Sequence, residues 1–270
     1  MSAHNFRDAL AVELSCLWQC AQFSRRHLRY FIIFLFLYGP SLLHWKRYRA
    51  ARVGFCTAQW IDDLLDGDRR SEDEPLEIIE QLVQEMETEH FSRDPLSQLT
   101  AALFAELSPD GRSEFIALVR TMQRDRMRVL GGEVWEDSDL DAHHQTTFRL
   151  SVNLMLRTAG CTARAEEVPA LVEALAWCSV FRDLDDDLRK GLINVPRRAW
   201  RTTPEAYETW IHESRARASS AIARAAMEIE RLDDERSRRI LRVFQSSIAR
   251  FERRLRPRQI TRRVAGVLTS

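Results

Sequence analysis

The sequence predicts an all-α protein, and three observations support this. Apolar residues recur at spacings of three and four along most of the chain, which is the period of a helix with one buried face. No segment alternates apolar and polar residues as a half-buried strand does. Glycine and proline are few, at 9 and 8 of 270 residues, and most fall between the periodic segments, where helices end. With 45% hydrophobic residues, the chain can bury a sizeable core.

Eight segments have this helical period. Ser108–Pro109 and Thr203–Pro204 are typical helix starts, because serine and threonine cap the first turn and proline suits the first helical position. The expected helices cover residues 9–28, 47–65, 77–89, 113–130, 142–158, 168–190, 204–232 and 236–255. No repeat or change of composition divides the chain. We therefore expect residues 1–270 to form one domain of about eight to ten helices, with a basic tail from about residue 250.

Charge and cysteine content exclude some classes of function. Lys and Arg total 40 and Asp and Glu total 40, so the chain lacks the basic excess of a nucleic-acid binder and we expect no nucleic-acid partner. Five cysteines without a CxxC pair indicate a reduced, cytoplasmic protein.

Two segments raise the question of membrane contact. The apolar run at residues 30–45 is interrupted by Gly39 and Pro40. It is also shorter than the roughly 20 residues that cross a bilayer, so we expect a buried or membrane-touching helix and turn there. Arginines crowd residues 236–263. Such a basic helix and tail is compatible with peripheral contact with an anionic membrane, although a solvated charged face is the commoner explanation of such a pattern.

Two acidic clusters lie inside otherwise apolar helices. Asp62 and Asp66 are four residues apart, so their carboxylates lie on one helix face, with Asp63 beside them. Asp183 and Asp187 repeat this spacing. Like charges at this spacing destabilise a helix unless something compensates them, and Mg²⁺ is typically held by one or two carboxylates together with substrate phosphates. The clusters therefore predict a Mg²⁺ site, whereas either cluster alone would fit a solvated acidic helix end.

The motifs resemble those of the squalene and phytoene synthases, of the trans-isoprenyl diphosphate synthase superfamily. The second cluster looks like the signature R-D-x-x-x-D-x-R-x-G-x-x-x-x-P, with Arg182, Asp183, Asp187, Arg189, Gly191 and Pro196. The first cluster is similar to D-[DE]-x-x-D-G, and Met122-x-x-Asp125 looks like the family's Met-x-x-Asp helix. The resemblance covers about residues 47 to 196, over half of the chain.

This resemblance implies an isoprenoid-synthase-type helical bundle around a central apolar cavity. It implies a prenyltransferase in which Asp62, Asp63, Asp66, Asp183 and Asp187 hold Mg²⁺ ions that bind the diphosphate of an allylic isoprenyl substrate. Loss of diphosphate would leave an allylic cation, which aromatic walls shield from water. Candidates for that wall are Phe55, Trp60, Phe148 and Trp177. The side chains expected to bind substrate are Arg182, Arg189, Lys190, Ser179, Asn153, Phe55 and Gln59.

The chain departs from the family pattern around the acceptor. Gln59 stands where the family has Arg, Ser179 where it has Asn, and Asn194 where it has Tyr. The family's Tyr-Cys-x-x-Val-Ala-Gly-x-Val-Gly helix is faint, with His144, Gln145, Arg149, Leu150 and Asn153 at five of its positions. Larger side chains should narrow the space for a second prenyl chain. The acceptor is therefore left open between a second prenyl diphosphate and another nucleophile such as an aromatic ring.

Two further alternatives remain. Class I terpene cyclisation would use the same metal clamp, but the cyclase triad Asn-Asp-x-x-Ser-x-x-x-Glu is absent. A non-catalytic helical partner or membrane-associated scaffold would leave the two complete aspartate pairs without a purpose. No G-x-G-x-x-G follows a strand, which argues against NADPH. The sequence thus predicts a Mg²⁺-dependent transferase of isoprenoid biosynthesis.

Overall fold

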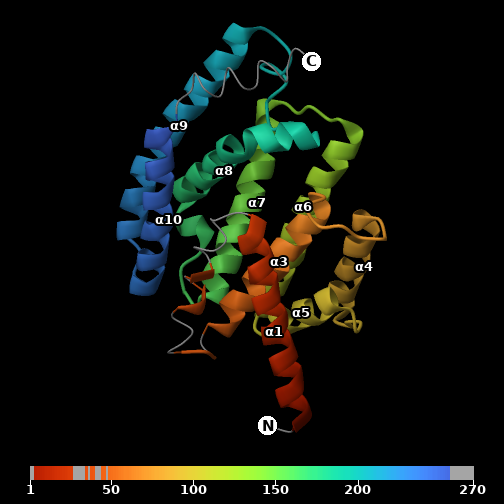
Figure 1. Cartoon of the computed structure of the whole chain (residues 1–270). Coiled ribbons are helices and arrows are strands. Elements are labelled where there is room, and N and C mark those ends of the chain that lie inside the picture. The colour runs from red at the N-terminus through yellow and green to blue at the C-terminus, as the bar shows by residue number, and fades with distance from the viewer. Residues whose placement is uncertain (1–2, 27–33, 36, 40–43, 47, 256–270) are drawn as a thin grey trace. The chain divides into compact units, whose positions relative to one another are not determined.

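The structure, a computed structural model, describes residues 3–26, 34–35, 37–39, 44–46 and 48–255. Over these residues it has nine α-helices and no strand, so the predicted all-α class is confirmed (Figure 1). The chain forms two compact units: unit 1 is Met1–Gln123 with Leu154–Gly160, and unit 2 is Arg124–Asn153 with Cys161–Ser270. Each unit is described by itself below. The single domain and the central cavity expected from the sequence stay predictions.

Among its described residues, unit 1 has four whole helices, namely α1 (Ala3–Arg26), α3 (Arg49–Leu65), α4 (Pro75–Thr88) and α5 (Pro95–Phe104). Helix α3 packs against α1, α4 and α5. No helix is predicted at α5, although Asp94 caps it by accepting hydrogen bonds from the backbone N–H groups of Leu96 and Ser97. Pro95 follows at the first helical position, so the usual start signal is present.

Two helices belong to both units. Helix α6 (Pro109–Gly131) begins in unit 1 and ends in unit 2, and α7 (Asp137–Thr158) begins in unit 2 and ends in unit 1. The last turns of α7 complete unit 1, where Arg157 Nε donates to Glu114 Oε2 at 2.7 Å. Gly54 of α3 lies against Thr158, since a Cβ on this glycine would be 2.9 Å from Thr158 Cγ2. Unit 1 is therefore discontinuous in the sequence.

A buried arginine joins α3 to α1. Arg52 is fully buried, and its guanidinium donates to both carboxylate oxygens of Glu13, at 2.7 and 3.0 Å. It also donates to the backbone carbonyl of Trp45 and stacks over the Trp45 ring at 3.9 Å. A buried guanidinium needs such partners because an unpaired charge is strongly destabilising in the interior. The contacts hold the helix that carries the first acidic cluster.

Unit 2 contains the 3-10 turn η2 (Ala165–Glu167), α8 (Pro169–Lys190), α9 (Pro204–Glu230) and α10 (Glu235–Arg254). Helix α8 packs against both α9 and α10. On its buried face, Phe181 lies between Trp177 of the same helix and Trp210 of α9 in an aromatic stack, with ring centroids 5.3 and 5.1 Å apart. Thr203 caps α9 by accepting a hydrogen bond from the Ala206 N–H, which confirms the predicted start of this helix.

Gly191 ends α8 and turns the chain back along it. The residue has a φ of +86°, a left-handed conformation that glycine adopts without a steric penalty. The turn is closed by a hydrogen bond from the Leu192 N–H to the Asp187 carbonyl at 2.8 Å. This local geometry brings the segment after α8 beside Asp187.

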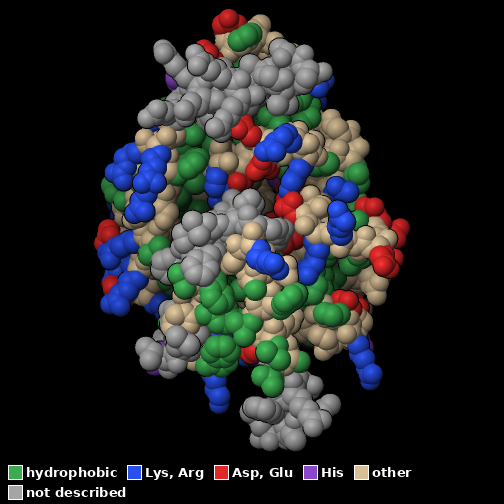
Figure 2. All heavy atoms as spheres, viewed as in Figure 1, with side chains coloured by type: hydrophobic (Ala, Val, Ile, Leu, Met, Phe, Trp, Pro, Cys, Tyr) green, Lys and Arg blue, Asp and Glu red, His purple; other side chains and the backbone are tan. Residues whose placement is uncertain are grey.

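The outer face of α10 is basic. Its exposed arginines are Arg239, Arg242, Arg250, Arg253 and Arg254. Figure 2 shows Lys and Arg side chains gathered over the region of α9 and α10. Within the described part of the chain, no helix is long and apolar enough to cross a membrane. Residues 256–270 and most of the run 30–45 lie outside the described residues, so the predictions on the tail and on a buried or membrane-touching helix stay predictions.

Candidate functional site

The first acidic cluster lies at the C-terminal end of α3 in unit 1. Asp63 is buried, Asp62 is half-buried and Asp66 is exposed at the helix end. The Gln59 side-chain amide donates to Asp62 Oδ2 at 3.2 Å and to Asp63 Oδ1 at 3.0 Å. Because an amide is neutral, Gln59 orients these carboxylates without adding the positive charge that an arginine would bring.

The second cluster lies in the last two turns of α8 in unit 2. Asp183 and Asp187 are both half-buried and one helical turn apart. Arg182 Nε donates to both carboxylate oxygens of Asp183, at 2.9 and 3.0 Å, and Arg182 Nη2 donates to Ser179 Oγ at 3.1 Å. The Arg182 side chain is 43% exposed, so this ion pair contributes little to stability. The arrangement instead presents a guanidinium beside a carboxylate at the protein surface.

A buried network continues from Asp187. Asn194 Nδ2 donates to Asp187 Oδ2 at 3.0 Å, and Arg128 Nη1 donates to Asn194 Oδ1 at 3.3 Å. The same Arg128 atom donates to Asp125 Oδ1 at 2.8 Å, and His143 Nε2 lies 2.9 Å from Asp125 Oδ2. Asn194, Arg128 and His143 are all buried. Through this network, residues from three segments of the chain hold the Asp187 carboxylate in place.

The surroundings of this network shift the pKa values of Asp125 and His144. Burial alone would raise the pKa of Asp125, but the hydrogen bond with His143 and the charge of Arg128 outweigh it and hold the pKa below its usual range. For His144, burial is the largest influence and lowers the pKa from 6.5 to about 4, despite the nearby Asp125 charge. The imidazole of His144 is therefore neutral at pH 7.

We expect the free energy of unfolding to fall as the pH drops from 6.5 to about 4. In this window the unfolded chain protonates His144 while the folded chain keeps it neutral, so acid favours unfolding. Urea unfolding at steps of pH measures this slope, and His144→Gln should flatten it. The matched control, His212→Gln, changes an exposed histidine of α9 and should keep the slope of the original protein. An unchanged slope in His144→Gln would contradict the assignment.

Other residues expected to bind substrate have different surroundings. Arg189 and Lys190 are exposed in the last turn of α8, where Arg189 forms an ion pair with Asp186. In unit 1, Phe55 is half-buried and packs edge-on against Phe23, with ring centroids 6.0 Å apart. Arg189 and Lys190 thus lie close in sequence to the second cluster, and Phe55 lies one turn before Gln59 on α3.

Asn153 has a structural environment. Its side chain is fully buried, with Oδ1 accepting from the Ala165 N–H at 2.7 Å and Nδ2 donating to the Glu166 carboxylate at 3.3 Å. These bonds tie α7 to η2. The structure therefore shows what Asn153 does for the fold, and its role in substrate binding stays a prediction.

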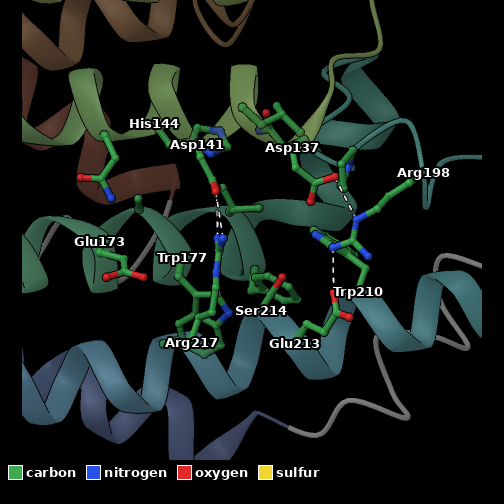
Figure 3. Close-up of a pocket in the computed structure, with 18 residues that line it drawn as sticks. Asp137, Asp141, His144, Glu173, Trp177, Arg198, Trp210, Glu213, Ser214 and Arg217 are labelled. Carbon is green, nitrogen blue, oxygen red and sulfur yellow. Dashed lines mark hydrogen bonds and ion pairs between the residues drawn. The ribbon is translucent and has the colours of Figure 1, made fainter.

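A cavity of about 110 Å³ lies among α7, α8 and α9 in unit 2 (Figure 3). One side is formed by the aromatic stack of Trp177, Phe181 and Trp210. Asn194 and His144 also line it, so the cavity wall shares Asn194 with the network behind Asp187. The charged lining residues are Asp137, Asp141, Glu173, Arg198, Glu213 and Arg217.

Sequence reasoning missed most of the cavity lining and most of the hydrogen-bonded network at Asp187. Of the aromatic lining, it indicated only Trp177, and it noted Asn194 only as a departure from the family pattern. Arg128 lies three residues after Asp125 on α6, a spacing that allows an ion pair, and this was the available signal. The remaining contacts join residues that are far apart in the chain.

The acidic pairs fit the ligand type that Mg²⁺ prefers. Among the described residues, no three His, Cys, Asp or Glu side chains come together as a metal-ligand set. Mg²⁺ does not need three, because it is usually held by one or two carboxylates, water and substrate phosphates. Asp183 and Asp187 offer two such oxygen ligands, and so do Asp62 and Asp66. That the two pairs act together stays a prediction.

Comparison with known proteins adds no relative. No protein-family model matches the chain, and neither a curated protein nor a solved structure matches it. The likeness to the squalene and phytoene synthases therefore remains a resemblance of motifs. The function has to be argued from the residues themselves.

Proposed function

We propose that this protein is a Mg²⁺-dependent prenyltransferase that ionises an allylic isoprenyl diphosphate and joins the prenyl group to an acceptor. The observation that supports this best is the hydrogen-bonded path from Asp187 through Asn194 and Arg128 to Asp125. It connects residues of two motifs that the resemblance identifies separately. Random acidic helix ends would have no reason to share a buried network.

The carboxylates would supply the metal ligands. Asp183 and Asp187 would hold Mg²⁺ with diphosphate oxygens as further ligands, and Asp62 and Asp66 would do the same from α3. When bound, Mg²⁺ supplies positive charge that stabilises the departing diphosphate. The network behind Asp187 keeps its carboxylate in a fixed orientation, which a metal ligand requires.

The basic residues of α8 would bind the diphosphate directly. Arg182 is held in place by Asp183 and Ser179 and keeps an exposed guanidinium edge. Charge-assisted hydrogen bonds from Arg182, Arg189 and Lys190 to phosphate oxygens would position the leaving group. Phe181, the residue before Arg182, lies in the middle of the ring stack, which would offer an apolar surface that excludes water from an allylic cation.

The proposal is tested by diphosphate release from geranyl, farnesyl and geranylgeranyl diphosphate, each given alone, with and without Mg²⁺. We expect release only with Mg²⁺. Mass analysis of the extracts then distinguishes coupling of two prenyl chains from cyclisation, and prenyl alcohol alone would indicate a missing acceptor. No release at any chain length would reject the proposal.

The proposal also includes a location. We place the protein in the cytoplasm and at the membrane surface, because an isoprenoid product is apolar and the outer face of α10 is basic. Co-sedimentation with anionic vesicles, with and without residues 250–270, tests this. Equal binding of both forms would reject a role for the tail.

A further inference from the structure

We infer that the cavity of unit 2 is a binding site for a small phenolic compound with a single ring. Resting on the proposed function, the bound ring would be the acceptor of the prenyl group. Four features of the cavity support this inference: its volume, its aromatic wall, an unpaired buried donor, and the charge of its lining.

The volume admits one ring. The cavity holds about 110 Å³ and opens to solvent beside its charged residues. An apolar cavity of about 150 Å³ in a protein core holds benzene, whereas pockets for drug-sized ligands measure about 300–1,000 Å³. The unit 2 cavity is therefore near the lower limit for a benzene ring and far too small for a farnesyl chain.

The wall favours an aromatic occupant. Phe181 stacks on Trp177 at an interplanar angle of 29° and on Trp210 at 24°, and all three rings line the cavity. Aromatic rings prefer offset-stacked or edge-to-face contacts with such a surface. A single additional ring can continue this packing, which an aliphatic chain would not do.

An unpaired donor lies in the same wall. Trp177 is 8% exposed, and its buried indole N–H has no hydrogen-bond partner among the described residues. Buried donors without a partner are uncommon in native structures. The N–H is closed off from the cavity space, so a ligand oxygen would accept this hydrogen bond once the indole turns toward the cavity.

The charges of the lining indicate which oxygen-bearing group the ligand should carry. Four carboxylates and two guanidinium groups line the cavity. Arg217 donates to both oxygens of Asp141 at 2.8 and 3.0 Å, and Arg198 pairs with Asp137 and Glu213 (Figure 3). A ring carboxylate would add negative charge to this acidic lining. A phenol is neutral, and its oxygen accepts from an N–H while its O–H donates to a carboxylate.

The position of the cavity suits an acceptor. Asn194 lines it and donates to Asp187, so one hydrogen bond separates the wall from the second acidic cluster. In the transfer, the bond between the allylic C1 and the diphosphate oxygen breaks and the electron pair leaves with the diphosphate. A ring carbon then bonds to C1, and the proton displaced from this carbon passes to the released diphosphate.

Binding is tested by adding phenol to the full-length ¹⁵N-labelled protein and following its seven tryptophan indole N–H signals. We expect the largest shift at Trp177, whose signal is identified by its absence in Trp177→Phe. This variant keeps a ring but loses the donor, and calorimetry should show about tenfold weaker phenol binding. Toluene and benzoate should bind the unmodified protein at least about tenfold more weakly than phenol, because toluene lacks the oxygen and benzoate carries a negative charge.

Trp200→Phe is the matched control. Trp200 packs against the same buried cluster but does not line the cavity, so its replacement should leave phenol affinity unchanged. If Trp177→Phe loses helix content, Ser214→Val serves instead, since Ser214 is buried and lines the cavity and a larger side chain there should weaken binding. Phenol binding that neither variant weakens, or no shift at the Trp177 signal, would overturn the inference.

The outcome does not depend on prenyl transfer, because no prenyl diphosphate is present in the binding experiment. A shift at Trp177 in a protein that releases no diphosphate would keep the phenol site and reject the proposed function. Diphosphate release without any shift at Trp177 would keep the proposed function and reject the phenol site.

Discussion

Asp183→Asn is expected to lower Mg²⁺-dependent diphosphate release by at least about 100-fold. The amide keeps the size of the side chain but removes the negative charge that holds a hard cation. It also replaces one of the two oxygens that accept hydrogen bonds from Arg182 with an NH₂ group, which cannot accept them. Since the pair is partly exposed, helix content and unfolding midpoint should change little. Release is measured from a single prenyl diphosphate at saturating Mg²⁺, with circular dichroism on the same samples.

Two further variants make this result specific. Asp62→Asn should lower release to a similar extent, because it removes the corresponding charge of the first cluster. Asp139→Asn is the matched control, since Asp139 is an exposed aspartate of α7 outside every motif, and it should release diphosphate at the original rate. Near-normal release by Asp183→Asn or by Asp62→Asn would contradict the role of that carboxylate.

Arg128→Met is expected to lower the free energy of unfolding by about 3 kcal/mol. Arg128 is almost fully buried, and it donates to Asp125, to Asn194 and to the Ile193 carbonyl. Methionine fills a similar length but leaves these acceptors without their donor, and Asp125 keeps a poorly compensated charge. Urea unfolding measures the loss. Replacing Asp125 by Asn in the same protein should recover part of it, because the charge is then removed too.

The matched control for this variant is Arg124→Met. Arg124 is exposed on the same helix and stacks on the same Trp135 ring as Arg128, with centroid distances of 4.6 and 4.0 Å. Its loss should cost less than about 1 kcal/mol. Equal destabilisation by the two variants would show that the stacking on Trp135 matters and the buried network does not.

Most helices were predictable because each one buries one face and exposes the opposite face to solvent. Helix α10 buries Leu241 and Ile248 while arginines cover its outer face, and such a pattern is visible in the sequence. Helix α5 was missed because it is short and buried on most sides, so apolar Leu103 and Phe104 follow each other without polar contrast. For α7 the prediction begins at residue 142, whereas the helix begins at Asp137, since its first turn is polar.

The site was predictable only where its residues are close together in the sequence. The spacing of Asp183 and Asp187 follows from the helical period, and α8 places both on one face as expected. The contact between Arg128 and Asn194 joins residues 66 positions apart, and no local pattern encodes it. The cavity likewise needs side chains from α7, α8 and α9 at once. Motif spacing therefore locates candidate ligands, whereas their supporting residues require the packed structure.

The discontinuity of unit 1 has a consequence for the order of events during translation. Residues 154–160 belong to unit 1, yet the ribosome adds residues 124–153 of unit 2 before them. At roughly 5–20 residues per second, adding these residues takes about 1.5 to 6 seconds. Throughout that time Glu114 lacks Arg157, and Gly54 lacks the threonine that packs on it. The nascent chain must therefore keep the helix of the first acidic cluster incompletely packed until part of the other unit has already emerged.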